Sequence, residues 1–325
     1  MRKFGKWAGR ALLLLAALFV LVFTFGPREP AGTDLSFDDS TLGNDLDLYL
    51  ATVEARFADI TPGVEKHIIW AGQPGQKTGI AIVYVHGWSA TAQEIRPVPD
   101  NVAKALGANL FYTRLTGHGR PGQALADATV QDWFHDMAEA RAIGRRLGDK
   151  VIYISTSTGG TLVTELAAAT DDIAGVVLIS PNYKIKNPLA VLLTQPFARA
   201  YVPLIEGETR TWKGKNADHE KYWTNSYPAV AVLPLAALVQ HVNTLDITKM
   251  NMPALFVYNM LDQTVDETVT AQVAANWGGG SQTFIPDVPE AEKDDAHVIT
   301  GDIISPDRTL SVTKAIIDWA NGLNL

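Results

Sequence analysis

The chain contains no cysteine in its 325 residues. That absence excludes a disulfide scaffold, zinc–thiolate and iron–sulfur sites, and catalysis by a thiol. It does not indicate a compartment, because a protein without thiols folds equally well under oxidising or reducing conditions. We also expect no cofactor and no metal ion, since no motif in the sequence completes a site for either.

Charged residues are scarce as well, at 19% of the sequence, and 35 acids against 27 bases give a net charge of −8. The first ten residues hold four bases and no acid, which leaves −12 for the rest of the chain. A body of that charge is a poor partner for a phosphate backbone, so we expect no binding to nucleic acid. Hydrophobic residues make up 47%, enough for one large core or two smaller ones, which excludes global disorder.

An apolar run covers residues 11–25, with Thr24 as its one polar member. Bases precede the run and several acids follow it, a pattern typical of a secretory signal or a membrane anchor. We expect residues 1–26 to form an uncleaved membrane anchor, because no small-x-small cleavage site follows Phe25; a cleaved signal peptide is the alternative. Either interpretation puts the body outside the cytoplasm, in a bacterium at the inner membrane and periplasm, or secreted after cleavage.

From about residue 66 the chain alternates short apolar runs with helical patterns, which predicts an α/β fold with a doubly wound, mostly parallel sheet. The expected strands are residues 67–71, 80–85, 109–114, 151–154, 174–179, 254–258 and 282–285. The expected helices are residues 92–106, 130–147, 160–169 and 308–323. The core would comprise residues 66–180 and 251–325, after a tether and N-terminal extension at 27–65.

Between residues 181 and 250 this alternation stops. Two apolar segments there, at 187–193 and 230–239, have a helical pattern. We interpret residues 181–250 as a helical cap or lid packed over the sheet. The alternative is that they add helices to the main layer.

The expected strand at 151–154 runs into a helical segment through Ser155-Thr156-Ser157-Thr158-Gly159. A nucleophile on a tight strand-to-helix turn needs small residues two before and two after it, because the backbone there is crowded. Ser155 and Gly159 meet this need for Ser157, although glycine is usual at the first place. Centring the motif on Ser155 would put Ser157 where glycine is expected. We therefore predict Ser157 as the nucleophile, with an ordinary polar loop as the alternative.

Another expected strand ends in His86-Gly87-Trp88. In enzymes with a nucleophile turn, the loop after this strand and the residue after the nucleophile each supply a backbone N–H to the oxyanion. By position, these donors are the amides of Trp88 and Thr158. We interpret His86 as a structural histidine of the loop.

An acid and a base follow near the end of the chain. Asp262 comes just after the expected strand at 254–258, where open α/β sheets place functional residues, and we prefer it to Asp266 as the orienting acid. For either acid, a turn or helix-capping role is the alternative. His297 lies on the loop before the last expected helix, from which it could reach both a serine and an acid.

These motifs resemble those of the α/β-hydrolase superfamily, and most of all its carboxylesterase and monoacylglycerol-lipase branch. The resemblance covers about residues 66–323 and rests on His86-Gly87-Trp88, the Ser157 turn, and residues 114–119, 261–266 and 297–299. It implies a triad of Ser157, Asp262 and His297, in the chain order of that family, and a lid over an acyl pocket. Two features depart from the branch: Ser155 replaces glycine, and an N-terminal anchor is atypical of soluble esterases.

We therefore predict a serine hydrolase that cleaves a carboxylic ester with an apolar acyl group. A thioester, an amide or a C–C bond stays open as the scissile bond, because the same triad serves each. An acyltransferase and a non-catalytic, membrane-anchored binding protein are the alternatives. The expected partners are a small-molecule or lipid ester and, through the N-terminal segment, a membrane; the sequence does not indicate an oligomeric state.

Overall fold

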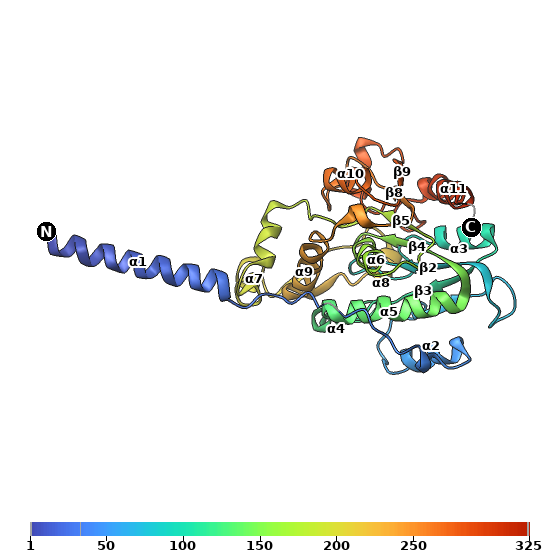
Figure 1. The fold of residues 1–325 in the computed structure, drawn as a ribbon, viewed down its shortest axis with the longest axis horizontal. Coiled ribbons are helices and arrows are strands. Elements are labelled where there is room, and N and C mark those ends of the chain that lie inside the picture. The colour runs from blue at the N-terminus through green and yellow to red at the C-terminus, as the bar shows by residue number, and fades with distance from the viewer. Residues whose placement is uncertain (1, 33, 324) are drawn as a thin grey trace.

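The computed structural model describes residues 2–32, 34–323 and 325, and its body is built on a central seven-stranded sheet (Figure 1). The strand order is β1-β3-β2-β4-β5-β8-β9, and all neighbours are parallel except β1 and β3. The strands are β1 (His67–Ile69), β2 (Thr78–Val85), β3 (Asn109–Tyr112), β4 (Gly148–Thr156), β5 (Gly175–Ile179), β8 (Ala254–Val257) and β9 (Ser281–Phe284). The predicted mostly parallel sheet is confirmed, with boundaries that differ by a few residues.

Helices cover both faces of this sheet, which explains why its central strands are continuous apolar runs. One face packs against α5 (Val130–Leu147), α6 (Thr158–Ala169) and α10 (Glu267–Ala275) through a core that includes Trp133 and Phe256. The other face packs against α3 (Val98–Leu106) and α11 (Pro306–Gly322) through a core that includes Ile154 and Trp319. Because both faces are covered, functional side chains can gather at the carboxyl ends of the strands.

The predicted helix at 92–106 begins only at Val98. Pro97 accounts for the late start, because the residue before a proline is disfavoured in the helical region. Residues 92–97 form turns instead, and they bring Glu94 back toward the end of β2. The short helix α4 (Gly122–Asp127) follows β3.

The N-terminal extension is more structured than its composition indicates. After the short 3₁₀ turn η1 (Asp39–Leu42), the helix α2 (Leu46–Glu54) begins with a side-chain cap from Asp45. Leu42, Leu46 and Leu50 are buried in the same core as α5. The extension is therefore attached to the body by apolar burial.

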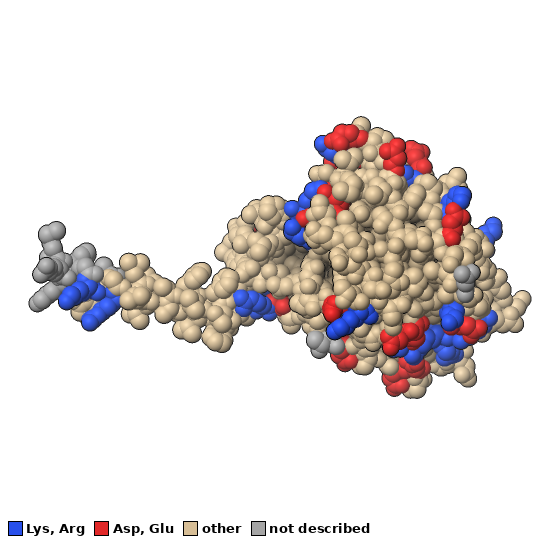
Figure 2. Space-filling view, turned by 45° about the horizontal axis from the view of Figure 1, so that its top comes forward, with Lys and Arg blue, Asp and Glu red and all other residues tan. Residues whose placement is uncertain are grey.

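The predicted apolar run forms the helix α1 (Arg2–Phe25), which projects away from the body (Figure 1). Figure 2 shows a long uncharged stretch between the basic side chains near its start and the body. In the described part of the chain, however, no helix meets the length and apolarity that a membrane crossing requires. The run at 11–25 rises about 22 Å, less than the ~30 Å of a hydrocarbon core. The predicted membrane anchor, and the location derived from it, are thus not supported.

Between β5 and β8 lies a segment, residues 180–253, that we call the β5–β8 segment. It contains η2 (Pro188–Thr194), α7 (Ala198–Glu206), β6 (Thr209–Thr211), α8 (Ala217–Tyr222), β7 (Ser226–Pro228), η3 (Ala229–Ala231), α9 (Val232–Val242) and η4 (Ile247–Lys249). The strands β6 and β7 pair with each other and do not join the central sheet. The first predicted apolar helix here is a 3₁₀ helix, and the second begins only at Val232.

Candidate active site

Ser157 lies at the turn between β4 and α6. Its φ of 51° and ψ of −113° are a strained backbone conformation for a serine. The turn is held because the Ser157 N–H donates to the oxygen of Ile179 at 2.9 Å, and its carbonyl accepts from the Asn182 N–H at 3.1 Å. A β-carbon on Gly159 would lie 2.2 Å from the carbonyl oxygen of Val85, so glycine is required there. The turn thus has the local structure that a nucleophile motif predicts.

Ser155, the other candidate hydroxyl, has a different environment. Its side chain is fully buried, and its Oγ donates to the carbonyl oxygen of Val177 at 3.1 Å. Serine therefore fits where glycine is usual, because its small hydroxyl finds a buried acceptor. Ser157, in contrast, lines a cavity that is described below.

His297 lies between the 3₁₀ helix η5 (Glu290–Asp295) and α11, and its ring contacts both predicted partners. Its Nε2 is 3.0 Å from Ser157 Oγ, and its Nδ1 is 2.8 Å from Asp262 Oδ2. Because a carboxylate can only accept, the ring proton belongs on Nδ1, and Nε2 accepts from the serine hydroxyl. The three side chains form one continuous hydrogen-bonded chain.

The two candidate acids differ in their surroundings. Asp262 is 1% exposed, and its Oδ1 accepts from the N–H groups of Thr264 and Val265 at 2.7 and 3.0 Å. Asp266 caps α10, and a hydrogen bond from Lys184 lowers the pKa of Asp266 to about 2. Of the two, Asp262 is the acid whose carboxylate reaches the ring of His297.

Two opposing influences act on the basicity of His297. Burial disfavours its charged form, but the charge of Asp262 and the hydrogen bond to it raise the pKa of His297. The neutral ring is consequently a stronger base than an unperturbed histidine. It is suited to take a proton from the adjacent hydroxyl.

Backbone amides without an acceptor adjoin Ser157. Within the described residues, neither the N–H of Trp88 nor that of Thr158 makes a hydrogen bond. Thr158 begins α6, and the N-terminal end of a helix favours negative charge. Gly87 lies beside the serine, since a β-carbon on Gly87 would be 3.2 Å from the Ser157 β-carbon. The two amides can therefore donate to an anionic oxygen formed at Ser157.

His86 orients the peptide that carries the Trp88 amide. Its Nε2 accepts from the Leu115 N–H at 3.1 Å, so Nδ1 carries the proton and donates to the Gly87 oxygen at 2.9 Å. The C=O and N–H of a trans peptide point in opposite directions, so this bond directs the Trp88 N–H away from His86. Burial lowers the pKa of His86 to about 4, which keeps the ring neutral. This agrees with the structural role predicted for His86.

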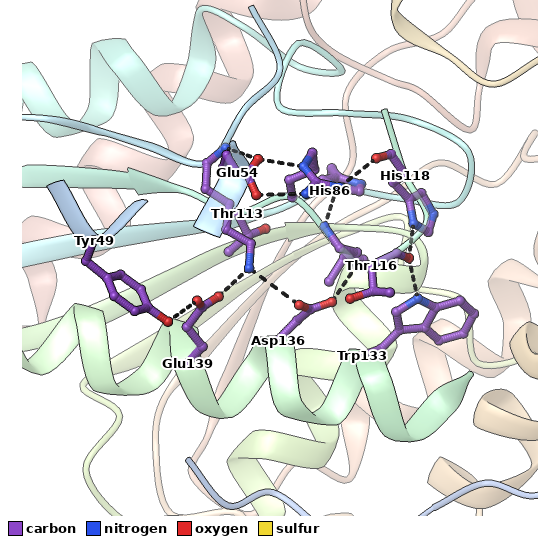
Figure 3. A network of polar contacts seen from close by, with 12 residues as sticks. Tyr49, Glu54, His86, Thr113, Thr116, His118, Trp133, Asp136 and Glu139 are labelled. Atoms are coloured by element: carbon purple, nitrogen blue, oxygen red, sulfur yellow. Dashed lines mark hydrogen bonds and ion pairs between the residues drawn. The ribbon is translucent and has the colours of Figure 1, made fainter. Parts of the chain in front are cut away.

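A buried polar network lies behind this loop and connects it to the N-terminal extension (Figure 3). Arg114 donates to both carboxylate oxygens of Glu54 in α2, at 2.6 and 2.7 Å, and to the oxygen of His118 at 3.1 Å. Both members of the Arg114–Glu54 pair are less than 8% exposed. Arg114 immediately precedes Leu115, whose amide orients His86. The extension therefore supports the loop that follows β2 through Arg114 and its neighbour Leu115.

A second part of this network involves α5. Lys66 pairs with Glu139 and with Asp136, whose Oδ2 accepts from the Thr116 N–H at 2.5 Å. Tyr49 of α2 donates to the other oxygen of Glu139 at 2.7 Å. Buried charges are stable only when paired and hydrogen-bonded, as they are here. Of the residues after β3, Thr116 is thus held by α5 and Arg114 by α2.

A cavity of about 480 Å³ opens onto Ser157 and His297. The strand ends form one wall, and the β5–β8 segment forms the opposite wall with two kinds of side chain. Its aliphatic lining residues are Ile185, Leu189, Ala190, Leu193, Val232 and Leu235. Its aromatic and charged lining residues are Glu206, Arg210, Trp212, His219, Trp223 and Tyr227. A larger groove of about 540 Å³ lies under α2, and none of the predicted site residues lines it.

The structure adds residues that the sequence did not single out. Glu94 lines the cavity although it lies in a stretch expected to be helical, where no motif marks it. His219 lies within residues 181–250, the segment expected to form the cap, and it too lines the cavity. Hydrophobic patterning could not have found either, because both are polar residues whose place depends on turns. Within the described residues, no cluster of His, Asp and Glu could hold a metal ion.

The sequence profile of the alpha/beta hydrolase family matches residues 82–301 of this chain. A thermostable monoacylglycerol lipase from a Bacillus species is 26% identical over 186 residues, which are 57% of this chain and 72% of that protein.

Solved structures of lipolytic enzymes are similar in fold. One, from a study of the metagenome-derived enzymes LipS and LipT, matches with a TM-score of 0.64 at 20% identity, covering 81% of this chain and 99% of that one. The monoacylglycerol lipase of Paleococcus ferrophilus matches with a TM-score of 0.56 at 15% identity, covering 79% and 98%. At these identities the structural likeness concerns the fold alone.

Proposed function

The chain belongs to the alpha/beta hydrolase family, and on this premise we propose that it is a serine hydrolase that cleaves carboxylic esters through an acyl-enzyme. The observation that carries the proposal is the hydrogen-bonded chain from Ser157 through His297 to Asp262. The partner-free amides of Trp88 and Thr158 support it, since acyl transfer develops negative charge on an oxygen. Similarity to a monoacylglycerol lipase supports an ester as the substrate.

In the first half of the reaction, Ser157 Oγ bonds to the ester carbonyl carbon while His297 Nε2 takes the hydroxyl proton. The carbonyl oxygen becomes anionic and accepts from the amides of Trp88 and Thr158. The imidazolium then gives its proton to the departing alkoxide, which leaves as an alcohol. The acyl group stays on Ser157 until water, activated by His297 in the same way, releases the acid. Asp262 accepts from Nδ1 throughout and stabilises the imidazolium.

The two parts of the cavity wall favour an ester whose acyl part is apolar and whose alcohol part is polar. An apolar acyl chain would be buried against the aliphatic side chains contributed by η2 and α9, which stabilises it by removing apolar surface from water. The alcohol part would face the aromatic and charged side chains, where Arg210 and Trp212 offer donors to hydroxyl groups. In this role the β5–β8 segment is a cap over the reacting groups.

Labelling with a fluorophosphonate probe, followed by peptide mapping, tests the proposal. The phosphonyl group should be found on Ser157 and at no other serine, because only an activated hydroxyl reacts readily with this probe. Ser155→Ala serves as the matched control and should be labelled like the unaltered protein. No label, or label on Ser155, would refute the assignment.

A further inference from the structure

Glu94 is an unusual residue for the wall of an acyl-transfer site, because a carboxylate there opposes the charge that the reaction creates. It is 3% exposed and lines the cavity next to Ser157. Its Oε2 accepts from the Gly87 N–H at 2.7 Å and from the Tyr84 hydroxyl at 3.0 Å. The glutamate therefore holds the first peptide of the loop that ends in the Trp88 amide.

The other carboxyl oxygen of Glu94 approaches the reacting groups. A β-carbon on Gly87 would lie 2.7 Å from Glu94 Oε1 and 3.2 Å from the Ser157 β-carbon, so both side chains flank the same point. No hydrogen bond to Oε1 is found within the residues that the structure describes. When the acid is protonated, its proton therefore belongs on Oε1, because Oε2 is occupied by two donors.

We propose that Glu94 is a positioning residue that works as a neutral carboxylic acid: it anchors the Gly87–Trp88 loop through Oε2, and loss of its proton makes the site inactive. This inference rests on the proposed function of Ser157. An ionised Glu94 would place a negative charge beside the developing oxyanion. It would also stabilise the imidazolium of His297, so the ring would hold its proton and less of the neutral base would be present.

The surroundings of Glu94 favour the neutral form. Burial raises the pKa of Glu94 to about 7, although the Gly87 N–H, the Tyr84 hydroxyl and the charge of His297 oppose the shift. The titratable groups that face it are Tyr84 from β2 and His297 from the loop before α11. Across the cavity, the β5–β8 segment adds Glu206, Arg210 and His219.

The test is the pH profile of kcat/KM for Glu94→Gln, measured with a nitrophenyl ester on the full chain. In the unaltered enzyme, activity should rise as His297 loses its proton and fall again, by about 10-fold or more, as Glu94 loses its own. The amide of Glu94→Gln cannot ionise, so the fall above pH 7 should disappear.

Two further variants distinguish this role from a structural one. Tyr84→Phe removes a hydrogen bond that lowers the pKa of Glu94, so the alkaline fall should move to higher pH. Glu165→Gln changes a buried glutamate that pairs with His241 away from the cavity, and it should leave both limbs in place.

An alkaline fall that persists in Glu94→Gln, even with a lower rate, would overturn the inference. If Glu94→Gln folds poorly, the shift in Tyr84→Phe decides the matter by itself. An unaltered enzyme that neither hydrolyses esters nor reacts with the fluorophosphonate would refute the proposed function instead, and the inference with it.

Discussion

The two walls of the cavity are built in different ways. On the sheet side, Ser157 and Glu94 line the cavity, and Asp262 supports this wall through His297. All three are at most 5% exposed and hydrogen-bonded. On the side of the β5–β8 segment, short 3₁₀ helices carry apolar side chains such as Leu189, which is 60% exposed. The reacting groups are therefore held at strand ends, while the part of the opposite wall that η2 contributes is more exposed.

The largest effect on activity should come from substituting the residues of the sheet side that take part in the reaction. Ser157→Ala or His297→Ala should lower kcat by on the order of 10⁴–10⁶-fold, because the nucleophile or its base is lost. Thermal unfolding should stay close to that of the unaltered protein. Ser155→Ala is the matched control, with a loss of no more than a few-fold in rate. An active Ser157→Ala variant would contradict the assignment.

The two acids that follow β8, Asp262 and Asp266, allow a sharper comparison on the sheet side. Asp262→Asn should lower kcat by on the order of 10³–10⁴-fold, because the amide can hold His297 in the wrong tautomer. Asp266→Asn removes a carboxylate that caps α10 and pairs with Lys184, so its main effect should be on stability. Steady-state kinetics of both variants check this. Equal losses in rate would show that the acids are not distinguished as we expect.

Beneath the sheet-side wall, the pair of Glu54 and Arg114 should matter for stability. Glu54→Gln should lower the free energy of unfolding by about 3–5 kcal/mol at pH 7, because a buried guanidinium loses its counter-charge. Burial opposes the shift, but Arg114 lowers the pKa of Glu54, so the carboxylate stabilises the fold above pH 4.5. That contribution is lost as the pH falls through the lower folded value.

Urea denaturation at two pH values measures this effect, and an exposed ion pair supplies the control. Asp318→Asn breaks the pair with Lys314 on the surface of α11 and should cost less than about 1 kcal/mol. A difference between the two variants that does not shrink toward pH 3 would contradict the role assigned to the buried pair.

The smallest effect is expected on the side of the β5–β8 segment. Leu189→Ala should lower kcat/KM for long-chain nitrophenyl esters by roughly 3- to 10-fold and leave short-chain esters nearly unchanged, because it removes apolar lining. Leu204→Ala changes a leucine that is 83% exposed and does not line the cavity. Chain-length profiles of the two variants should therefore differ. Identical profiles would mean that the acyl chain binds elsewhere.

Much of the sheet was predictable because the burial of a segment is reflected in which residue types follow one another along it. A strand covered on both faces must be apolar throughout, as residues 80–85 are, and a helix that begins after a strand turn needs small residues, as at Gly159. The predicted helix at 130–147 coincides with α5, whose start is marked by a capping box of Thr129 and Asp132.

The sequence by itself determined the type of fold and the kind of side chain at each strand end, because both depend on neighbours along the chain. The meeting of Ser157 with His297, 140 residues later, was decided by the order of the strands in the sheet. The approach of Glu94 to Gly87 depends on the turns at residues 92–97, and no periodic pattern encodes it. Such contacts exist only when the whole core has packed, since none of the participating segments could hold them alone.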